Sequence, residues 1–258
     1  MKPLQHAQIS AKNYGGNWTD YIEIHSFLDS SKATSAHFKH RFLLHHTEGI
    51  ELAVSVFGEK ITNSEKREIS TRKLLTEHLI EDVGRIVSIE DWVRDLMPEQ
   101  NNSFCRFLAK KREQIETNAI NGERELFQAF NLRQKDIEAI KKFLTFPFEN
   151  SDHPAALLFS HNSFAIFLAE KIFGYAFVKN TKKTDKDAFK KQLIAVREVF
   201  ERLIFLRLKA VYSPAEIIAR TNEADWMRGI DAGSAKAEKQ RLAEICREDE
   251  KLGVYNRK

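Results

Sequence analysis

Apolar residues recur along much of the chain at the three- and four-residue spacing of amphipathic helices. The stretch Thr71–Val83 carries leucine and valine on one stripe and is followed by Gly84, a residue typical of helix ends. Ser88 with Asp91 three residues later predicts the capped start of another helix. The run Ser213-Pro214-Ala215-Glu216 has the same signature, with proline in the first turn. These patterns predict an all-α fold.

Composition agrees with this prediction. Ten Gly and five Pro in 258 residues are about half the usual share, which favours long helices over a turn-rich β sandwich. Only short pieces such as GEKITN, at 58–63, fit a strand. Further helices are predicted at 19–28, at 36–57 as one or two helices, at 97–121, at 186–211 and at 234–252.

The sequence resembles itself at a shift of 116 residues. This shift lays Asp20–Gly58 over Asp136–Gly174, with 12 of 39 positions identical, where chance would supply about two or three. Farther along, Asp91-Trp92-Val93-Arg94 resembles Asp225-Trp226-Met227-Arg228 at a shift of 134. The second copy is therefore expected to carry about 18 extra residues, in a Lys-rich insertion near 175–192.

An internal duplication predicts the domain organisation. We expect a helical module at 1–100, a connecting helix at 101–116, and a diverged second module at 117–258. Duplicated modules often keep the contact of an ancestral homodimer. The two modules are therefore expected to pack as a pseudo-dimer.

Charge and cysteine content exclude few functions. The net charge of +4, from 41 Lys and Arg against 37 Asp and Glu, does not require a polyanionic partner. Cys105 and Cys246 are far apart and match no metal or redox spacing, which favours free thiols in a reducing compartment. The first residues lack an apolar run of signal-peptide length, and the chain has no 18-residue apolar stretch. We expect a cytoplasmic protein without a membrane partner.

Histidines cluster at the start of the chain. Seven of the nine lie in the first 78 residues, where even spreading would put about three. His25 with Asp29, and His78 with Asp82, are four residues apart and project from one helix face. Imidazoles and carboxylates arriving from several helices suit Zn, Mn or Fe. The expected metal ligands are His25, His45, His46, His78 and Asp82, with Asp29 or Glu81 as a catalytic base.

Other histidines are expected to play structural roles, because a lone histidine on a helix is usually a surface or satisfied core group. His6 and His40 fall in this class. In the repeat, His37 and His45 persist as His153 and His161, whereas His25, Asp29 and His46 become Lys141, Thr145 and Asn162. Either His37, His153 and His161 are structural and the first copy alone carries chemistry, or a once symmetric site has decayed in the second copy.

The segments YIEIHSFLDS, HFKHRFLLHH, EHLIEDVGRI and EDWVRDL resemble a small, uncharacterised His-rich domain of unknown function in bacterial and phage proteins, over about residues 5–96. That family implies no known reaction. The order His25, His45-His46, Asp82 also resembles the metal-dependent phosphohydrolases of the HD type, although the doublet here is His-His rather than His-Asp. This second resemblance implies a metal that polarises a phosphate and activates water.

Two functions therefore remain open. The first is a metal-dependent phosphohydrolase acting on a small, nucleotide-like phosphorylated ligand. The second is a non-catalytic interaction module, phage- or defence-related, in which the histidines are structural and a protein partner contacts the insertion. Nucleic acid is a weaker alternative, because acidic residues dilute the basic charge and a solvated loop explains it as well. The candidate contact residues are Lys182, Lys183, Lys186, Lys190 and Lys191.

Overall fold

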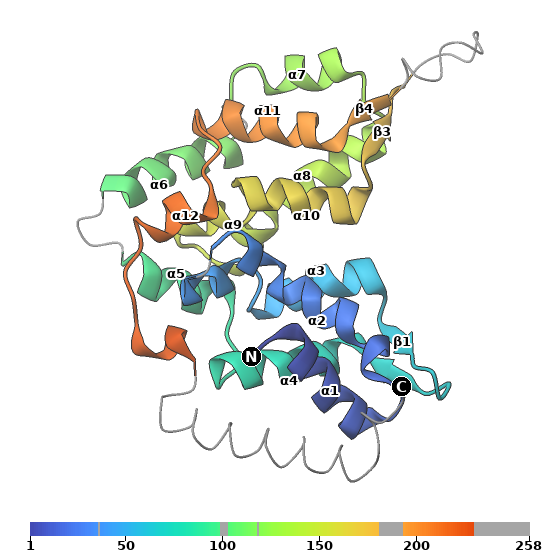
Figure 1. The fold of residues 1–258 in the computed structure, drawn as a ribbon. Helices are drawn as coiled ribbons and strands as arrows, with labels where there is room; N and C mark the ends of the chain where they lie inside the picture. Colours follow the sequence, from blue (N-terminus) through green and yellow to red (C-terminus); the bar gives the residue numbers. More distant parts are fainter. Residues whose placement is uncertain (36, 99–102, 118, 181–192, 230–258) are drawn as a thin grey trace.

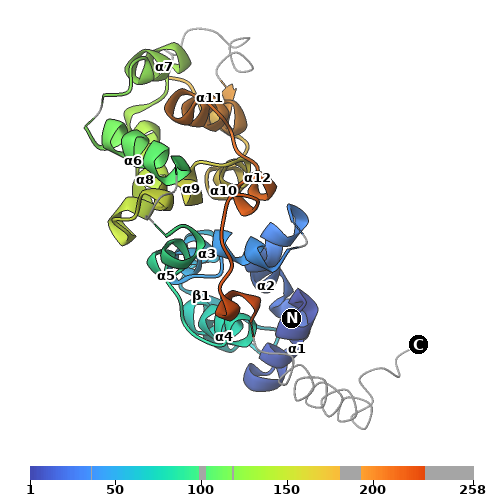
Figure 2. The ribbon, with the colours of Figure 1, turned by 90° about the vertical axis from the view of Figure 1, so that its left-hand side faces the viewer.

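Helices in two tiers make up the molecule (Figure 1). The computed structural model describes residues 1–35, 37–98, 103–117, 119–180 and 193–229. Residues up to 98 form the lower tier in this view, later residues form the upper tier, and the chain finally returns to the lower tier (Figures 1 and 2). The described chain is mostly helical with two small two-stranded sheets, as the sequence predicts. One continuous set of buried apolar side chains runs through both tiers.

The two tiers contain the same kinds of element. In the lower tier these are α1 (Pro3–Tyr14), η1 (Trp18–Asp20), α2 (Ile22–Leu28), η2 (Asp29–Ala33), η3 (Phe38–Leu43), α3 (Thr47–Phe57), β1 (Lys60–Thr62), β2 (Glu68–Ser70), α4 (Thr71–Val83) and α5 (Ile89–Leu96). In the upper tier they are α6 (Ser103–Glu116), α7 (Glu123–Phe130), α8 (Gln134–Asn150), η4 (Pro154–Ala156), α9 (Leu157–Ser160), α10 (Ser163–Phe173), β3 (Ala176–Val178), β4 (Leu193–Ala195), α11 (Val196–Leu208) and α12 (Pro214–Ile218). The short helix η7 (Asp225–Arg228) follows in the returning segment.

Local capping chemistry determines several helix ends where the sequence predicts them. Ser88 and Asp91 form a capping box that starts α5, and Ser213 and Glu216 form another that starts α12. Gly84 ends α4 with φ +80°, a left-handed conformation that glycine adopts without steric cost. These ends depend on neighbouring residues only, so the sequence alone was sufficient to predict them.

Two longer predictions have different outcomes. The stretch predicted as one or two helices at 36–57 forms two, η3 and α3, which are separated at His46 because this residue is extended and caps α3. The helix predicted at 186–211 starts outside the described residues, and Leu193–Ala195 form the strand β4 before α11 begins. The helix predicted at 234–252 lies outside the described residues.

From α3 and α10 onward, the same elements follow in the same order in both tiers. Helices α3 and α10 have 11 residues each, and α4 and α11 have 13 each. Equivalent backbone hydrogen bonds join them: Thr47 N–H donates to Val87 O at 2.8 Å, and Ser163 N–H donates to Tyr212 O at 2.9 Å. A second equivalent pair lies at the first residues of α4 and α11. Thr71 N–H donates to Glu59 O, and Val196 N–H donates to Tyr175 O, both at 3.0 Å.

These equivalent hydrogen bonds correct the predicted alignment of the two tiers after the hairpin. The bonds above relate the tiers by 116 residues before the hairpin β3–β4 and by 125 after it, so the second hairpin is nine residues longer, not about 18. The helix that follows α11 is α12, at the place where α5 follows α4. Trp226 instead lies in η7, with its ring centroid 4.6 Å from that of Trp92 in the lower tier.

The tiers meet through reciprocal contacts. Helix α5 contacts η4, α12 contacts η3, and α3 contacts its counterpart α10. Phe42 and Phe159 meet edge to face in this interface, with ring centroids 5.5 Å apart. The side chain of Lys39, only 4% exposed, donates hydrogen bonds to the carbonyls of Ile218 and Thr221 at 3.0 Å each. A buried cation thus satisfies carbonyls at the end of α12.

Among the residues that the structure describes, no helix combines the length and the apolar character needed to cross a bilayer.

Replacing Lys39 by alanine is expected to lower the free energy of unfolding by about 1–3 kcal/mol, because the carbonyl of Thr221 loses its side-chain donor and the carbonyl of Ile218 loses one of its donors. Urea denaturation would measure this loss. The matched control is Lys142→Ala on the exposed side of α8, for which we expect a change within about 0.5 kcal/mol. A similar, small effect of both substitutions would contradict this account of the interface.

Candidate metal centre

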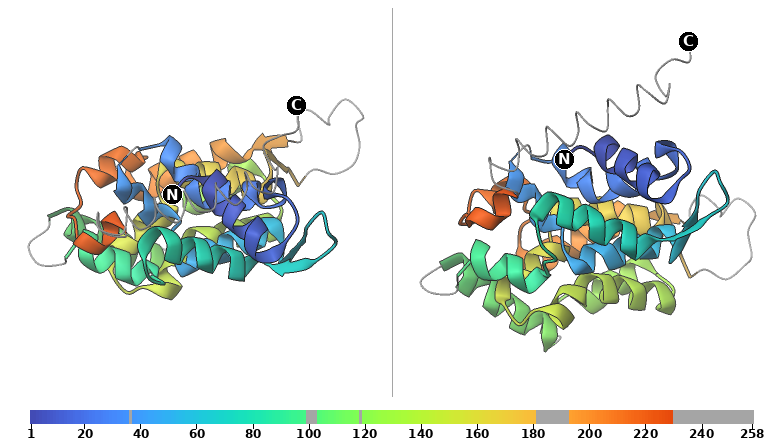
Figure 3. Two further views of the ribbon diagram at one scale, coloured as in Figure 1. Left: turned by 60° about the horizontal axis from the view of Figure 1, so that its bottom comes forward. Right: turned by 90° about the horizontal axis from the view of Figure 1, so that it is seen from below.

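Four segments of the lower tier bring six histidine and aspartate side chains together. They come from α1, from α2 and its end, from the residues between η3 and α3, and from α4. Seen from below, α1 and α4 lie side by side (Figure 3). All six residues are at most 4% exposed. They are His6, His25, Asp29, His45, His78 and Asp82.

The carboxylate of Asp82 lies at the centre of this cluster. It is 3.3 Å from Nε2 of His6, 3.1 Å from Nε2 of His45 and 3.7 Å from Nε2 of His78. The three imidazoles come from different segments, so each approaches the carboxylate from its own direction. Three nitrogen donors that face one buried carboxylate are the arrangement that a transition-metal ion requires.

Asp29 adds a second carboxylate. Its Oδ1 lies 3.5 Å from Nε2 of His45. One ligand atom from each of His6, Asp29, His78 and Asp82 lies within 4.8 Å of the others, so the group could hold a metal ion. In the described part of the chain, Oδ2 of Asp29 has no hydrogen-bond partner, whereas Oδ1 is paired with Lys32 Nζ at 2.6 Å. A buried polar atom without a partner is rare, and an ion at this point would satisfy it.

The outward-facing nitrogens of two imidazoles have partners of their own. His6 Nδ1 lies 2.5 Å from Oε2 of Glu81. His78 Nδ1 lies 2.9 Å from Nδ1 of His25, whose Nε2 is 2.8 Å from Oγ of Ser10. Such bonds orient a ring and determine which nitrogen carries the proton. They leave Nε2 of His6 and of His78 directed at the carboxylates.

The pKa shifts of three of these groups favour the protonation states that metal ligands need, which are neutral imidazole and ionised carboxylate. Burial lowers the pKa of His25 to about 3 and holds the pKa of His78 well below its ordinary value, and a charged His6 adds to both shifts. Burial alone would raise the pKa of Asp82, but hydrogen bonds with His45, His6 and His78 outweigh it and hold this pKa far below its usual range. His6 differs: burial lowers its pKa, but hydrogen bonds with Asp82 and Glu81 raise it overall.

Cations border the two carboxylates. Lys32, with 34% of its side chain exposed, pairs with Asp29. Arg41 Nε lies 3.5 Å from Oδ2 of Asp82, and its side chain is 12% exposed. The amino group of Met1 also contacts Asp82. These contacts offset part of the cost of burying two negative charges.

The predicted site residues divide into three groups. His78, Asp82 and Asp29 lie in the centre, and His45 joins them there. His25 and Glu81 lie behind it, bonded to ring nitrogens of the central imidazoles. The third group is His46 alone.

His46 does not reach the cluster, so its prediction as a ligand is wrong. Its Nδ1 accepts a hydrogen bond from the Gly49 N–H at 3.0 Å and caps α3, and its Nε2 lies 3.2 Å from the carbonyl of Leu43. His45 and His46 are adjacent in sequence, so their side chains point in different directions. Because α3 starts directly after His46, the side chain of His46 caps the helix and that of His45 enters the cluster.

His6 is the residue that the sequence analysis missed. It lies on an amphipathic helix without a carboxylate four residues away, so no local signal separates it from an ordinary core histidine. Only the packing of α1 against α4 brings its ring to 3.7 Å from the ring of His78, centroid to centroid.

Four of the histidines predicted to be structural have contacts typical of such roles, and one of them, His40, has its Nδ1 2.8 Å from Oγ of Ser31. His37 and His153 cap η3 and η4, accepting backbone N–H bonds of 3.2 and 3.1 Å from residues two positions on. Nε2 of His161 accepts from Arg207 at 3.1 Å, so its Nδ1–H donates to Oγ of Ser160 at 2.9 Å. His161 is therefore neutral, because guanidinium can only donate.

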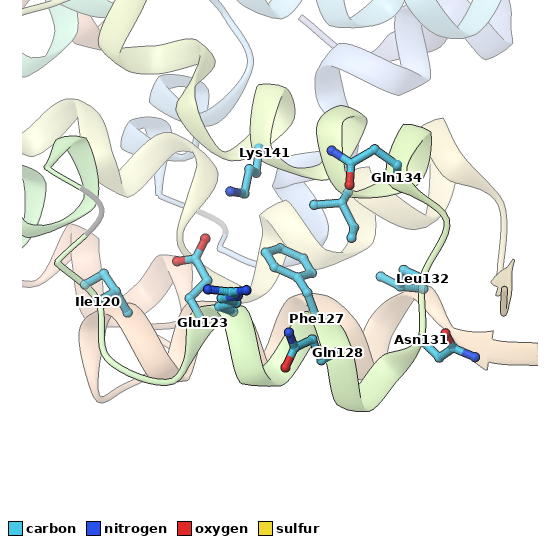
Figure 4. Close-up of a pocket in the computed structure, with 10 residues that line it drawn as sticks. Ile120, Glu123, Phe127, Gln128, Asn131, Leu132, Gln134 and Lys141 are labelled. Atoms are coloured by element: carbon cyan, nitrogen blue, oxygen red, sulfur yellow. The ribbon is translucent and has the colours of Figure 1, made fainter.

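The five candidate contact lysines fall at 182–191 and lie outside the described residues. Two large clefts do lie on the described surface, both in the upper tier. One separates α7 from α8 and is shown in Figure 4. The other lies between α7 and α11. Neither is lined by the clustered histidines.

Residues 1–101 match the model of a protein family described as a domain of unknown function (DUF6915). This match confirms the resemblance of the first module to an uncharacterised domain. Nothing among the curated proteins or the solved structures matches the chain.

His161→Gln is expected to reduce the pH dependence of stability. Burial, followed by Arg207, holds the pKa of His161 well below its ordinary value. The unfolded chain takes up a proton near pH 6.5, so the stability due to neutral His161 is complete above about pH 6.5 and is lost below it, at about 1.4 kcal/mol per pH unit. Urea denaturation between about pH 6.5 and 5 would measure a slope smaller by that amount in the variant. An unchanged slope would show that folded His161 takes up a proton.

Proposed function

We propose that the first module binds one divalent transition-metal ion. The ligands are Nε2 of His6, His45 and His78 together with carboxylate oxygens of Asp29 and Asp82. The observation that carries the proposal is the convergence of these five buried groups, four of which have ligand atoms within 4.8 Å of one another. Mixed imidazole and carboxylate donors suit Zn, Mn or Fe.

The groups behind the ligands support the same assignment. Glu81 contacts Nδ1 of His6, and His25 contacts Nδ1 of His78, which is the arrangement of partners that keeps a ligand ring in place. His25 therefore serves as a positioning residue in this proposal rather than as a ligand. Glu81 has the same role toward His6.

Protein reconstituted with Mn²⁺, Fe²⁺ or Zn²⁺ is expected to retain about one ion per chain and to unfold at a higher temperature than the chelated protein. His78→Gln and Asp82→Asn each remove a ligand, so their affinity should fall by more than about 100-fold. His25→Gln should cost about 10- to 100-fold, because only the orientation of His78 is lost. Elemental analysis and calorimetric titration would measure these effects.

The matched control for this experiment is His161→Gln, which changes a buried histidine of the other tier and should leave metal affinity unaltered. Purified protein that holds no transition metal after reconstitution would overturn the proposal. Equal affinity of the Asp82→Asn protein and the unchanged protein would overturn it too.

We further propose that the bound ion serves a phosphohydrolase reaction on a small, nucleotide-like phosphorylated substrate. A divalent ion polarises a phosphate oxygen and lowers the pKa of water at the ion to about 7. Lys32 and Arg41 support this function, because both are partly exposed and border the carboxylates, where they can also bind phosphate oxygens. The base would be a carboxylate oxygen that is not engaged by the ion or by His6, which leaves one oxygen each of Asp29 and Glu81.

Metal-loaded protein is expected to release inorganic phosphate from one or more of a panel of nucleoside mono-, di- and triphosphates. Chelation or Asp82→Asn should abolish the release, and Lys32→Gln should raise KM about tenfold or more through the loss of one charged contact. Lys142→Gln, on an exposed surface of the other tier, is the control. Metal-loaded protein that releases no phosphate above a protein-free blank would exclude this reaction for the panel while leaving metal binding in place.

The burial of the cluster favours a second candidate function. All its members are at most 4% exposed, as in sites where an ion stabilises a fold rather than a reaction. The first module would then be a non-catalytic interaction module with a structural ion, and a protein partner would contact another surface. Chelation would in this case lower the unfolding temperature of a protein that has no hydrolytic activity.

We also propose that the two tiers arose by internal duplication and pack as a pseudo-dimer. Two helices of equal length in each tier, α3 and α4 matching α10 and α11, follow in the same order and are joined by equivalent backbone bonds, which supports the duplication. The reciprocal contacts of α5 with η4 and of α12 with η3 support the pseudo-dimer, because a two-fold axis pairs each contact with its counterpart. The second module lacks the metal ligands: His161 remains, but Arg207 stands where the first module has Asp82.

A further inference from the structure

The cleft between α7 and α8 is a second place with distinctive chemistry (Figure 4). Its volume of about 570 Å³ is in the range typical of small-molecule sites. Glu123 and Phe127 project into it from α7, and Lys141 and Gln134 project from the side of α8 (Figure 4). Arg124 also lines it.

This cleft carries an excess of positive charge. In the described residues, neither Arg124 nor Lys141 takes part in an ion pair, and Lys141 Nζ lies 5.7 Å from the ring centroid of Phe127. The one carboxylate of the lining, Glu123, is already paired with the buried guanidinium of Arg207 through two bonds of 3.1 and 3.0 Å. Two cations therefore remain without a counter-charge among the described residues that line the cleft.

The free positive charge of the cleft comes from Lys141 and Arg124. Lys141 lies 116 residues after His25, and Arg207 lies 125 residues after Asp82, so both positions are basic in the upper tier. Arg207 does not line the cleft, because it is buried and bonded to Glu123 and His161.

We propose that this cleft binds a small organic phosphate of about nucleotide size. Its phosphate pairs with Lys141 and Arg124, whose charge-assisted hydrogen bonds are the strong contacts of such sites. Its organic part lies against Phe127 and the amides of Gln128 and Gln134. The volume is several times that of a phosphate ion, so the phosphate group alone leaves most of the cleft unfilled.

Calorimetric titration of the full chain with AMP tests this proposal, with adenosine and inorganic phosphate as comparison probes. A chelator is present throughout, so that AMP cannot bind through an ion at the metal centre. A negative result would therefore count against the cleft and would say nothing about the proposed metal site. We expect AMP to bind, inorganic phosphate to bind more weakly and adenosine to bind weakest. Lys141→Gln and Arg124→Gln should each weaken AMP binding by about tenfold or more.

Lys142→Gln is the matched control, because it removes the same charge from the next residue of α8, which does not line the cleft. It should leave AMP affinity unchanged. All variants should unfold at the temperature of the unchanged protein, because both lining cations are surface residues of their helices. The proposal is overturned by absence of AMP binding, by equal losses in Lys141→Gln and Lys142→Gln, or by phosphate binding as tightly as AMP.

Discussion

The lower tier depends on how it accommodates two carboxylates inside an apolar core. Transfer of an ionised carboxylate out of water costs several kcal/mol even after relaxation, and Asp29 and Asp82 are both almost fully buried. Their compensation comes from imidazoles on three segments and from the cations Lys32 and Arg41. The packing of α1, α2 and α4 around one point follows from this requirement, because each segment supplies a group that the carboxylates need.

The upper tier also buries an ionised side chain, but there the buried group is a cation. Arg207 is 2% exposed, and Glu123 and neutral His161 accept its hydrogen bonds. The backbone bonds that join α3, α4 and the hairpin recur in this tier, so the scaffold does not depend on which ions lie inside it. A scaffold of this kind can carry a cation site in one module and an anion site in the other.

Local signals in the sequence were sufficient for helix ends and for pairs on one helix. The caps at Ser88 and Ser213 and the pair His78–Asp82 depend only on near neighbours. Tertiary contacts decided the rest. His6 joins the cluster only through the packing of α1 on α4, and His46 is excluded by the exact start of α3. The spacing of the Trp226 motif misled the alignment, because η7 packs back onto the first tier, whereas α12 is the helix that follows α11 as α5 follows α4.

In the proposed metal centre, the same cations would connect metal binding with anion binding. Lys32 and Arg41 contact Asp29 and Asp82. A divalent ion would take over the charge of both carboxylates, so the two basic side chains would no longer have to compensate it. Their hydrogen-bond donors, beside a doubly charged ion, would then form a site of net positive charge that attracts phosphate. Binding of the ion and of an anionic substrate should therefore favour each other, whereas a purely structural ion needs no such coupling.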